Sequence, residues 1–190
     1  MTLIAILSAG PAGDSRPGAG LRRLALLAEG LTLLGVVIGT TFVAYIWSDP
    51  ERVRWHESGA LYGLPVAIDD RAWLVTGAIA VTALALFAWA MWEARALFRT
   101  LGAGDFFSVE VPRRLTRLGY LALVGSLGGI VQRAASEIVS RIGVTPRPTQ
   151  FHLTITSADY VSVIAALLLI AFAKVMHEAR RLAAENRGFV

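Results

Sequence analysis

The chain has 190 residues, of which 55% are hydrophobic and only 17% are charged. A soluble domain carries about 25% charged residues, so this composition excludes an ordinary soluble protein and indicates one that lies in a membrane. The chain has no cysteine, which excludes disulfides, thiolate metal ligands and cysteine nucleophiles. Its net charge of +4 comes from arginines clustered at the ends of apolar stretches, so we expect no direct binding to nucleic acid.

The first 20 residues are rich in Gly, Pro and Ala, which predicts a flexible N-terminal tail. The apolar start, residues 1–7, has no basic region before it. A cleaved signal peptide is therefore not expected, and the first apolar stretch is interpreted as an uncleaved anchor. Residues 21–190 are predicted to form one membrane domain.

Four apolar stretches follow, at about residues 24–47, 73–92, 115–138 and 160–176. A helix needs about 20 mostly apolar residues to cross a bilayer, and these stretches have that length. The predicted fold is therefore an all-α transmembrane four-helix bundle. After residue 172 the pattern becomes amphipathic, which predicts that the last helix continues beyond the membrane for two or three turns.

Basic residues are distributed unevenly between the two sides of these spans. Twelve lie before span one, around the connection between spans two and three or at the end of span four, and six lie in or around the other two connections. Under the positive-inside rule, both termini are then cytoplasmic. We expect a multi-pass protein of the bacterial cytoplasmic (inner) membrane, in contact with the lipid bilayer along its spans.

The connection before span four alternates between apolar and polar residues from Gln150 to Thr156. A period of two with β-branched residues is typical of a strand. We therefore expect a small extracytoplasmic β element, in which this segment pairs with residues 142–145 or 61–68.

Two spans contain a G-x-x-x-G pattern: Gly35 and Gly39 in span one, and Gly125 and Gly129 in span three. In lipid, small residues let helix backbones approach closely. The pattern serves either packing within one chain or a homodimer, and the sequence leaves both open.

Polar residues within or beside the spans are the second kind of candidate site, because a charge in lipid is costly and is usually paired or functional. Arg133 and Glu137 are four residues apart, so we predict that they pair with each other or each meet a polar partner on another helix. The intramembrane polar residues are Glu29, Gln132, Arg133, Glu137 and Lys174.

No catalytic pattern is visible. The three histidines, His56, His152 and His177, lack the spacing of metal ligands, and no nucleotide-binding or nucleophile motif is present. We therefore expect no metal, no cofactor and no enzymatic activity.

Two segments resemble a known family. One is Gly104-Asp-Phe-Phe-Ser followed by an Arg-Leu helix start that leads to Gly119, and the other is His177 to Asn186. They are similar to uncharacterised four-span bacterial membrane proteins, catalogued as a domain of unknown function and often encoded beside small Cro-type regulators. Ala179 and the ending Arg187-Gly-Phe-Val depart from the family pattern.

These features favour a non-enzymatic regulatory or immunity-type membrane protein that binds a cytoplasmic regulatory protein. The alternative is a small channel or transporter that uses the polar residues of the spans, and an intramembrane enzyme comes last. An amphipathic helix that leaves a bundle is a common docking element. The predicted partner-binding residues are Phe106, Phe107, Arg113, Arg114, Glu178, Leu182 and Glu185.

Overall fold

The computed structural model describes residues 19–60, 69–105, 108–140, 142 and 154–187. Within these ranges the chain forms helices and no strand: α1 (Ala19–Trp47), α2 (Pro50–Ala60), α3 (Asp70–Gly102), α4 (Glu110–Ser140) and α5 (Ser157–Arg187). All but α2 are long and apolar enough to cross a membrane. The predicted all-α class and four spans are confirmed, and the chain is a multi-pass membrane protein.

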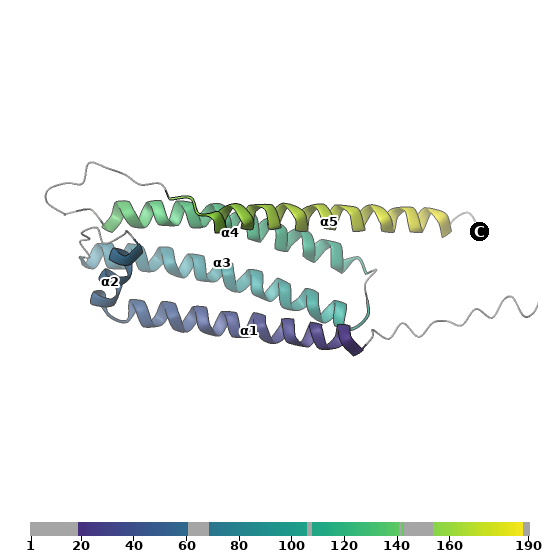
Figure 1. The fold of residues 1–190 in the computed structure, drawn as a ribbon, viewed down its shortest axis with the longest axis horizontal. Helices are drawn as coiled ribbons and strands as arrows, with labels where there is room; N and C mark the ends of the chain where they lie inside the picture. The colour runs from purple at the N-terminus through teal and green to yellow at the C-terminus, as the bar shows by residue number, and fades with distance from the viewer. Residues whose placement is uncertain (1–18, 61–68, 106–107, 141, 143–153, 188–190) are drawn as a thin grey trace, which may run out of the picture.

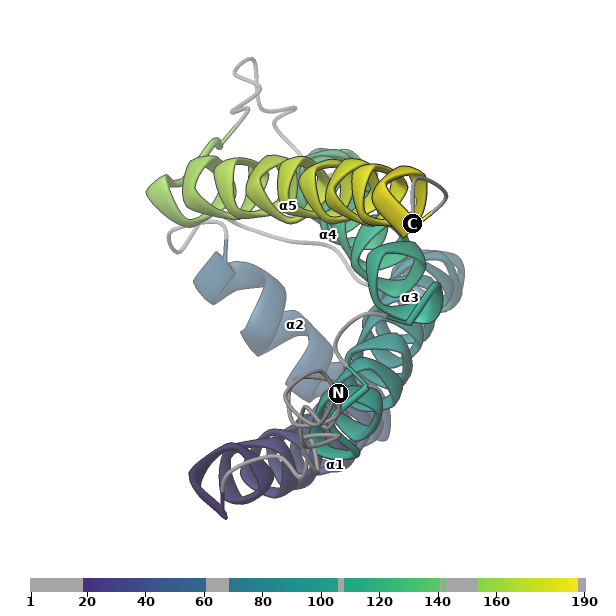
Figure 2. The same ribbon diagram turned by 90° about the vertical axis from the view of Figure 1, so that its right-hand side faces the viewer.

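The four long helices pack as neighbours in a row, α1 against α3, α3 against α4 and α4 against α5 (Figure 1). Seen along their length, they form a curved row with α1 and α5 at its two ends, and α2 lies on the inner side of the curve (Figure 2). We call the end where α1 begins and α5 ends the terminal end. The opposite end, which carries α2, is the α2 end.

Many large apolar side chains point outward, which is expected of helices that face lipid. Leu31, Val37 and Leu168 are 67%, 61% and 54% exposed. The buried positions are mostly small or polar residues, and α3, in the middle of the row, buries Ala72, Thr76, Ala80, Glu93, Ala94 and Leu97. Packing between these helices therefore relies on close backbone approach.

The glycines of the two G-x-x-x-G patterns have different surroundings. A Cβ at Gly39 would lie 3.3 Å from the Leu84 side chain, and one at Gly35 would lie 3.5 Å from Phe87, so this pair packs against α3 within the chain. A Cβ at Gly125 would meet nothing within 4 Å. The closest approach in α4 is instead at Gly119, where a Cβ would lie 2.6 Å from the Ile170 side chain of α5.

Helix α2 was not expected from the sequence. The Asp49 side chain accepts a 2.9 Å hydrogen bond from the Glu51 backbone N–H, and Pro50 occupies the first helical position, where its missing N–H costs nothing. Val53 and Glu57, four residues apart, are both buried. This short helix therefore folds back over the end of the row instead of forming an open loop.

The predicted β element is not found in the described part of the chain. Thr156 caps α5: the Asp159 backbone N–H donates to its hydroxyl, and the Thr156 N–H donates to the Asp159 carboxylate at 2.7 Å. The Thr154 carbonyl accepts from Arg133 at 3.4 Å. Side chains therefore satisfy backbone groups that a strand would pair, while residues 150–153 and the predicted partners, 61–68 and 143–145, lie outside the described residues.

Two further predictions concern the ends of the chain. The extension of span four is confirmed, because α5 continues to Arg187. The predicted N-terminal tail lies almost wholly outside the described residues, and α1 begins at Ala19.

Candidate functional site

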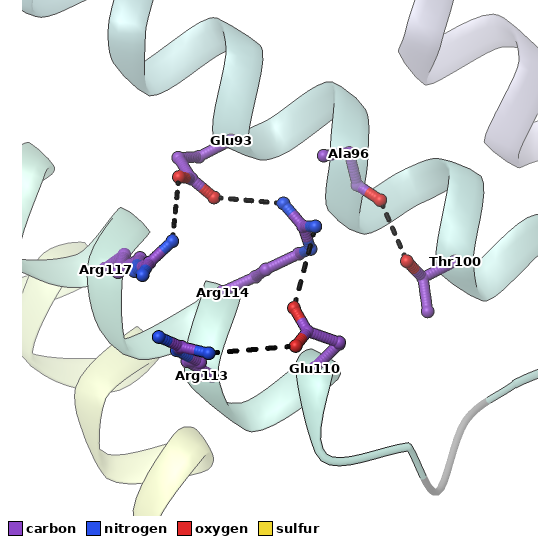
Figure 3. A network of polar contacts seen from close by, with 7 residues as sticks. All are labelled: Glu93, Ala96, Thr100, Glu110, Arg113, Arg114 and Arg117. Carbon is purple, nitrogen blue, oxygen red and sulfur yellow. Dashed lines mark hydrogen bonds and ion pairs between the residues drawn. The ribbon is translucent and has the colours of Figure 1, made fainter.

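The terminal end contains an ion-pair network between α3 and α4 (Figure 3). Its centre is Glu93, which is only 7% exposed. One carboxylate oxygen lies 3.3 Å from Arg114 and the other lies 3.4 Å from Arg117. Glu110 lies 3.6 Å from Arg114 and 3.9 Å from Arg113. A buried carboxylate with two cationic partners from another helix is a strong constraint on how the two helices sit together.

A second carboxylate joins α1 to α3 at the same end. Glu29 has 20% of its side chain exposed and lies 3.8 Å from both Arg95 and Arg99. The predicted intramembrane Glu29 is therefore a structural link near the end of a span. Together, Glu29 and Glu93 tie α1, α3 and α4 to one another.

The local sequence explains how the network forms. Helix α3 ends at Gly102, and Gly104 has a φ of 85°, a left-handed conformation that glycine adopts without strain. The chain then starts α4 at Glu110, so that Arg114 and Arg117 follow on one face, three residues apart. This face points at Glu93 (Figure 3).

A groove of about 510 Å³ separates the start of α4 from the second half of α5. It is lined from α4 by Val109, Pro112, Arg113 and Thr116, and from α5 by Ala173, Lys174, His177 and Glu178. The two segments that resemble the family therefore meet in space. Of the predicted partner-binding residues, Arg113 and Glu178 line this groove. Arg114 instead belongs to the ion-pair network around Glu93.

Helix α5 continues past the ends of the other helices (Figure 1). On this extension, Arg181 pairs with Glu178 at 2.6 Å and with Glu185 at 3.6 Å. Leu182 is 49% exposed. The extension therefore presents an apolar side chain, Leu182, beside charged side chains that pair with one another. Phe106 and Phe107 lie outside the described residues.

At the α2 end, Arg133 pairs with Asp159 of α5 at 2.5 Å. The prediction allowed for a partner on another helix, and Arg133 has one. Glu137 is 2% exposed and also has a polar or ionic interaction. Gln132 lines an open groove of about 870 Å³ between α3 and α4, together with Arg133 and the small residues Gly125, Gly128 and Gly129.

Titratable groups of α2 lie near the same end. Burial raises the pKa of Glu57 above its ordinary value of 4.5, and burial lowers the pKa of His56 below 6.5. The His56 ring packs edge-on against Phe42 and Trp47, with centroids 5.7 and 6.3 Å apart. An apolar environment disfavours the charged form of each group.

Two carboxylates that organise these contacts, Glu93 and Asp159, were not among the predicted site residues. Glu93 directly follows the apolar stretch that ends at Trp92, and Asp159 directly precedes another. Each is a carboxylate at the boundary of a span, at the same depth as arginines of a neighbouring span. This pattern could have identified both residues from the sequence. In the described ranges, no three His, Cys, Asp or Glu residues are placed to hold a metal ion.

Comparison with known protein families gives a match over most of the chain. The family described as "Protein of unknown function (DUF2975)" matches residues 53–187. The chain belongs to this family. No match was found among curated proteins or among solved structures.

The DUF2975 match begins within α2 and covers α3, α4 and α5. Several residues that carry the resemblance have structural roles: Gly104 turns the chain after α3, Arg114 and Arg117 hold Glu93, and Gly119 allows α5 to approach α4. The family-like sequence thus encodes the packing of these helices. The end of α5 beyond Glu178 is family-like and has no such packing role in the described residues.

Proposed function

We propose that this chain is a non-enzymatic membrane protein that binds a small regulatory protein in the cytoplasm through the projecting end of α5. One observation carries the proposal: α5 extends beyond the rest of the molecule with Leu182 exposed (Figure 1). A helix that merely spans the membrane needs no such extension.

Exposed apolar residues lie along one face of the second half of α5. Phe172, Val175, Ala179 and Leu182 are spaced by three or four residues and all are exposed. This spacing places them on one helix face. An amphipathic helix with such anchors fits an apolar groove on a partner, and the flanking charges of Glu178, Arg181 and Glu185 select its orientation.

The other helices support this role by holding the base of α5 in place. Glu93 fixes α4 against α3, and Gly119 brings α4 into close contact with Ile170 of α5. A rigid base reduces the entropy that is lost when a partner binds. The cytoplasmic placement of this end rests on the excess of arginines there.

The alternative, a channel or transporter, has less support. Glu29 pairs at the terminal end, Arg133 pairs at the α2 end, and Lys174 lies at an exposed position on α5. These polar residues therefore do not converge on one path across the membrane.

Photo-crosslinking tests the proposal. A photoreactive amino acid at Leu182 is expected to give an adduct with a soluble protein in cells, whereas the same substitution at Leu168, an exposed residue within the span, is expected to give none. Glu185→Lys should weaken the Leu182 adduct because it reverses one flanking charge. Identical adducts at both positions, or an adduct only with a second copy of the chain, would contradict the proposal.

A further inference from the structure

The groove between α4 and α5 has the character of an anion site. Arg113 and Lys174, from different helices, stand at its rim, and His177 adds a ring nitrogen. Its floor is apolar, because Pro112 and Ala173 are buried. The Thr116 hydroxyl donates to the Pro112 carbonyl at 2.9 Å and is already engaged.

The positive charges of the groove are only partly balanced. Glu110 lies 3.9 Å from Arg113 but is closer to Arg114, and the Glu178 carboxylate is held 2.6 Å from Arg181. Lys174 is the single lysine of the chain. Within the described ranges, no hydrogen bond or ion pair engages Lys174 or His177, so the groove offers free donors to an anion.

The groove also lies at the right depth for a lipid headgroup. At 1.5 Å per residue, Arg113 and Arg133 are about 30 Å apart along α4, which is the thickness of a bilayer's hydrocarbon core. If the Arg133–Asp159 pair marks one boundary of that core, Arg113 marks the other. Leu167, which is 53% exposed, lies two turns before Lys174 on the same face of α5 and extends the apolar surface below the groove.

We propose that this groove binds the phosphate of an anionic phospholipid in the leaflet at the terminal end. Arg113 and Lys174 contact the phosphate oxygens and His177 donates a further hydrogen bond, while an acyl chain lies along the exposed apolar face of α5. The site is at the base of α5, and it does not depend on whether the tip of α5 binds a protein.

Native mass spectrometry and thermal unfolding of the intact chain in a neutral detergent test the site. Phosphatidylglycerol is expected to stay bound and to raise the Tm, and phosphatidylcholine is expected to do neither. Each basic side chain near an anionic lipid contributes a factor of about five to binding, so the double variant Arg113→Gln, Lys174→Gln should bind phosphatidylglycerol roughly 25-fold more weakly. Lys174→Gln alone, which removes no internal contact, should show about a fivefold loss.

A matched control removes the same charge from the same end. Arg22 and Arg23 lie near the start of α1, are exposed and lie outside the groove, so Arg22→Gln, Arg23→Gln should retain the binding. An equal loss in both double variants would mean that the lipid responds to overall charge, and the site would be refuted. Stabilisation by inorganic phosphate equal to that by phosphatidylglycerol would identify a soluble anion as the ligand and would also contradict the proposal.

Discussion

The two ends of the helix row are held together in different ways. At the terminal end, the Glu29 and Glu93 carboxylates each meet two arginines from a neighbouring helix. At the α2 end, one arginine, Arg133, meets one carboxylate that also belongs to a helix cap. The terminal end therefore has bridged networks, whereas at the α2 end the Arg133–Asp159 pair links α4 to α5.

The difference lies mainly in α5. Networks at the terminal end tie α1, α3 and α4, whereas α5 forms its ion pair with another helix, Arg133–Asp159, at the α2 end. Toward the terminal end α5 is held by close packing at Gly119 instead. The polar side chains of its second half are thus left for lipid or protein. The terminal end therefore combines a fixed base, formed by α1, α3 and α4, with the less constrained second half of α5.

The largest effect is expected at Glu93. Glu93→Ala leaves Arg114 and Arg117 without their shared partner, and breaking a buried pair costs about 3–5 kcal/mol. Thermal unfolding in detergent should show a large fall in Tm. Glu178→Ala is the control, because its exposed pair with Arg181 contributes at most about 1 kcal/mol. Equal shifts for the two variants would show that Glu93 is not a buried bridge.

Close packing of α4 on α5 is expected to give the next largest effect. Gly119→Ala places a Cβ 2.6 Å from Ile170 and 3.1 Å from the Ala166 carbonyl, and overpacking of this kind costs about 1–3 kcal/mol. Gly125→Ala meets open space and should be neutral or stabilising, since alanine favours a helix by up to about 1 kcal/mol. A loss of stability at Gly125 would point to a second copy packed on that face.

The effects of the two residues of the Arg133–Asp159 pair at the α2 end are expected to be coupled. Arg133→Gln and Asp159→Asn should each lower the Tm, and the double variant should lose less than the sum because both remove the same interaction. Asp159→Asn should have the larger effect, since it also weakens the cap on Thr156. Additive shifts would indicate that the two side chains act independently.

The smallest effect is a pH dependence from α2. Because burial raises the pKa of Glu57, the folded state binds a proton more readily than the unfolded state, and stability increases as pH falls toward 4.5. The lowered pKa of His56 acts oppositely, so stability decreases as pH falls below 6.5. Unfolding measured from pH 8 to pH 4.5 should show a steeper acid loss for Glu57→Gln than for the native chain. His56→Phe, which keeps an aromatic ring against Phe42, should reduce that loss.

The spans were predictable because lipid imposes a strong and local requirement. A stretch of about 20 apolar residues is visible without knowledge of any partner, and the extension of α5 was visible in the same way from its amphipathic pattern. The turn at Gly104 likewise follows from local residue preferences. In each of these cases the cause lies within a few residues of its effect.

Other features depend on how distant segments meet. The partner of Arg133 is Asp159, 26 positions along the chain, and Glu93 meets arginines 21 and 24 positions away. Such pairs depend on the rotation and depth of each helix, which periodicity does not fix. The alternation before α5 suggested a strand, but a cap formed by Thr156 and Asp159 competes for the same backbone groups. Helix α2 was missed although Asp49 and Pro50 provide a start signal.

Cysteine labelling measures on which side of the membrane each end of the helix row lies, and the native chain has no cysteine that would interfere. Single variants Glu51→Cys, Leu168→Cys and Leu182→Cys are treated with a membrane-impermeant maleimide, in intact cells and after the membrane is opened. We expect labelling of Glu51→Cys in intact cells, labelling of Leu182→Cys only in opened cells, and labelling of Leu168→Cys in neither. Labelling of Leu182→Cys in intact cells would place the terminal end outside the cytoplasm, which would contradict a cytoplasmic binding role for the end of α5.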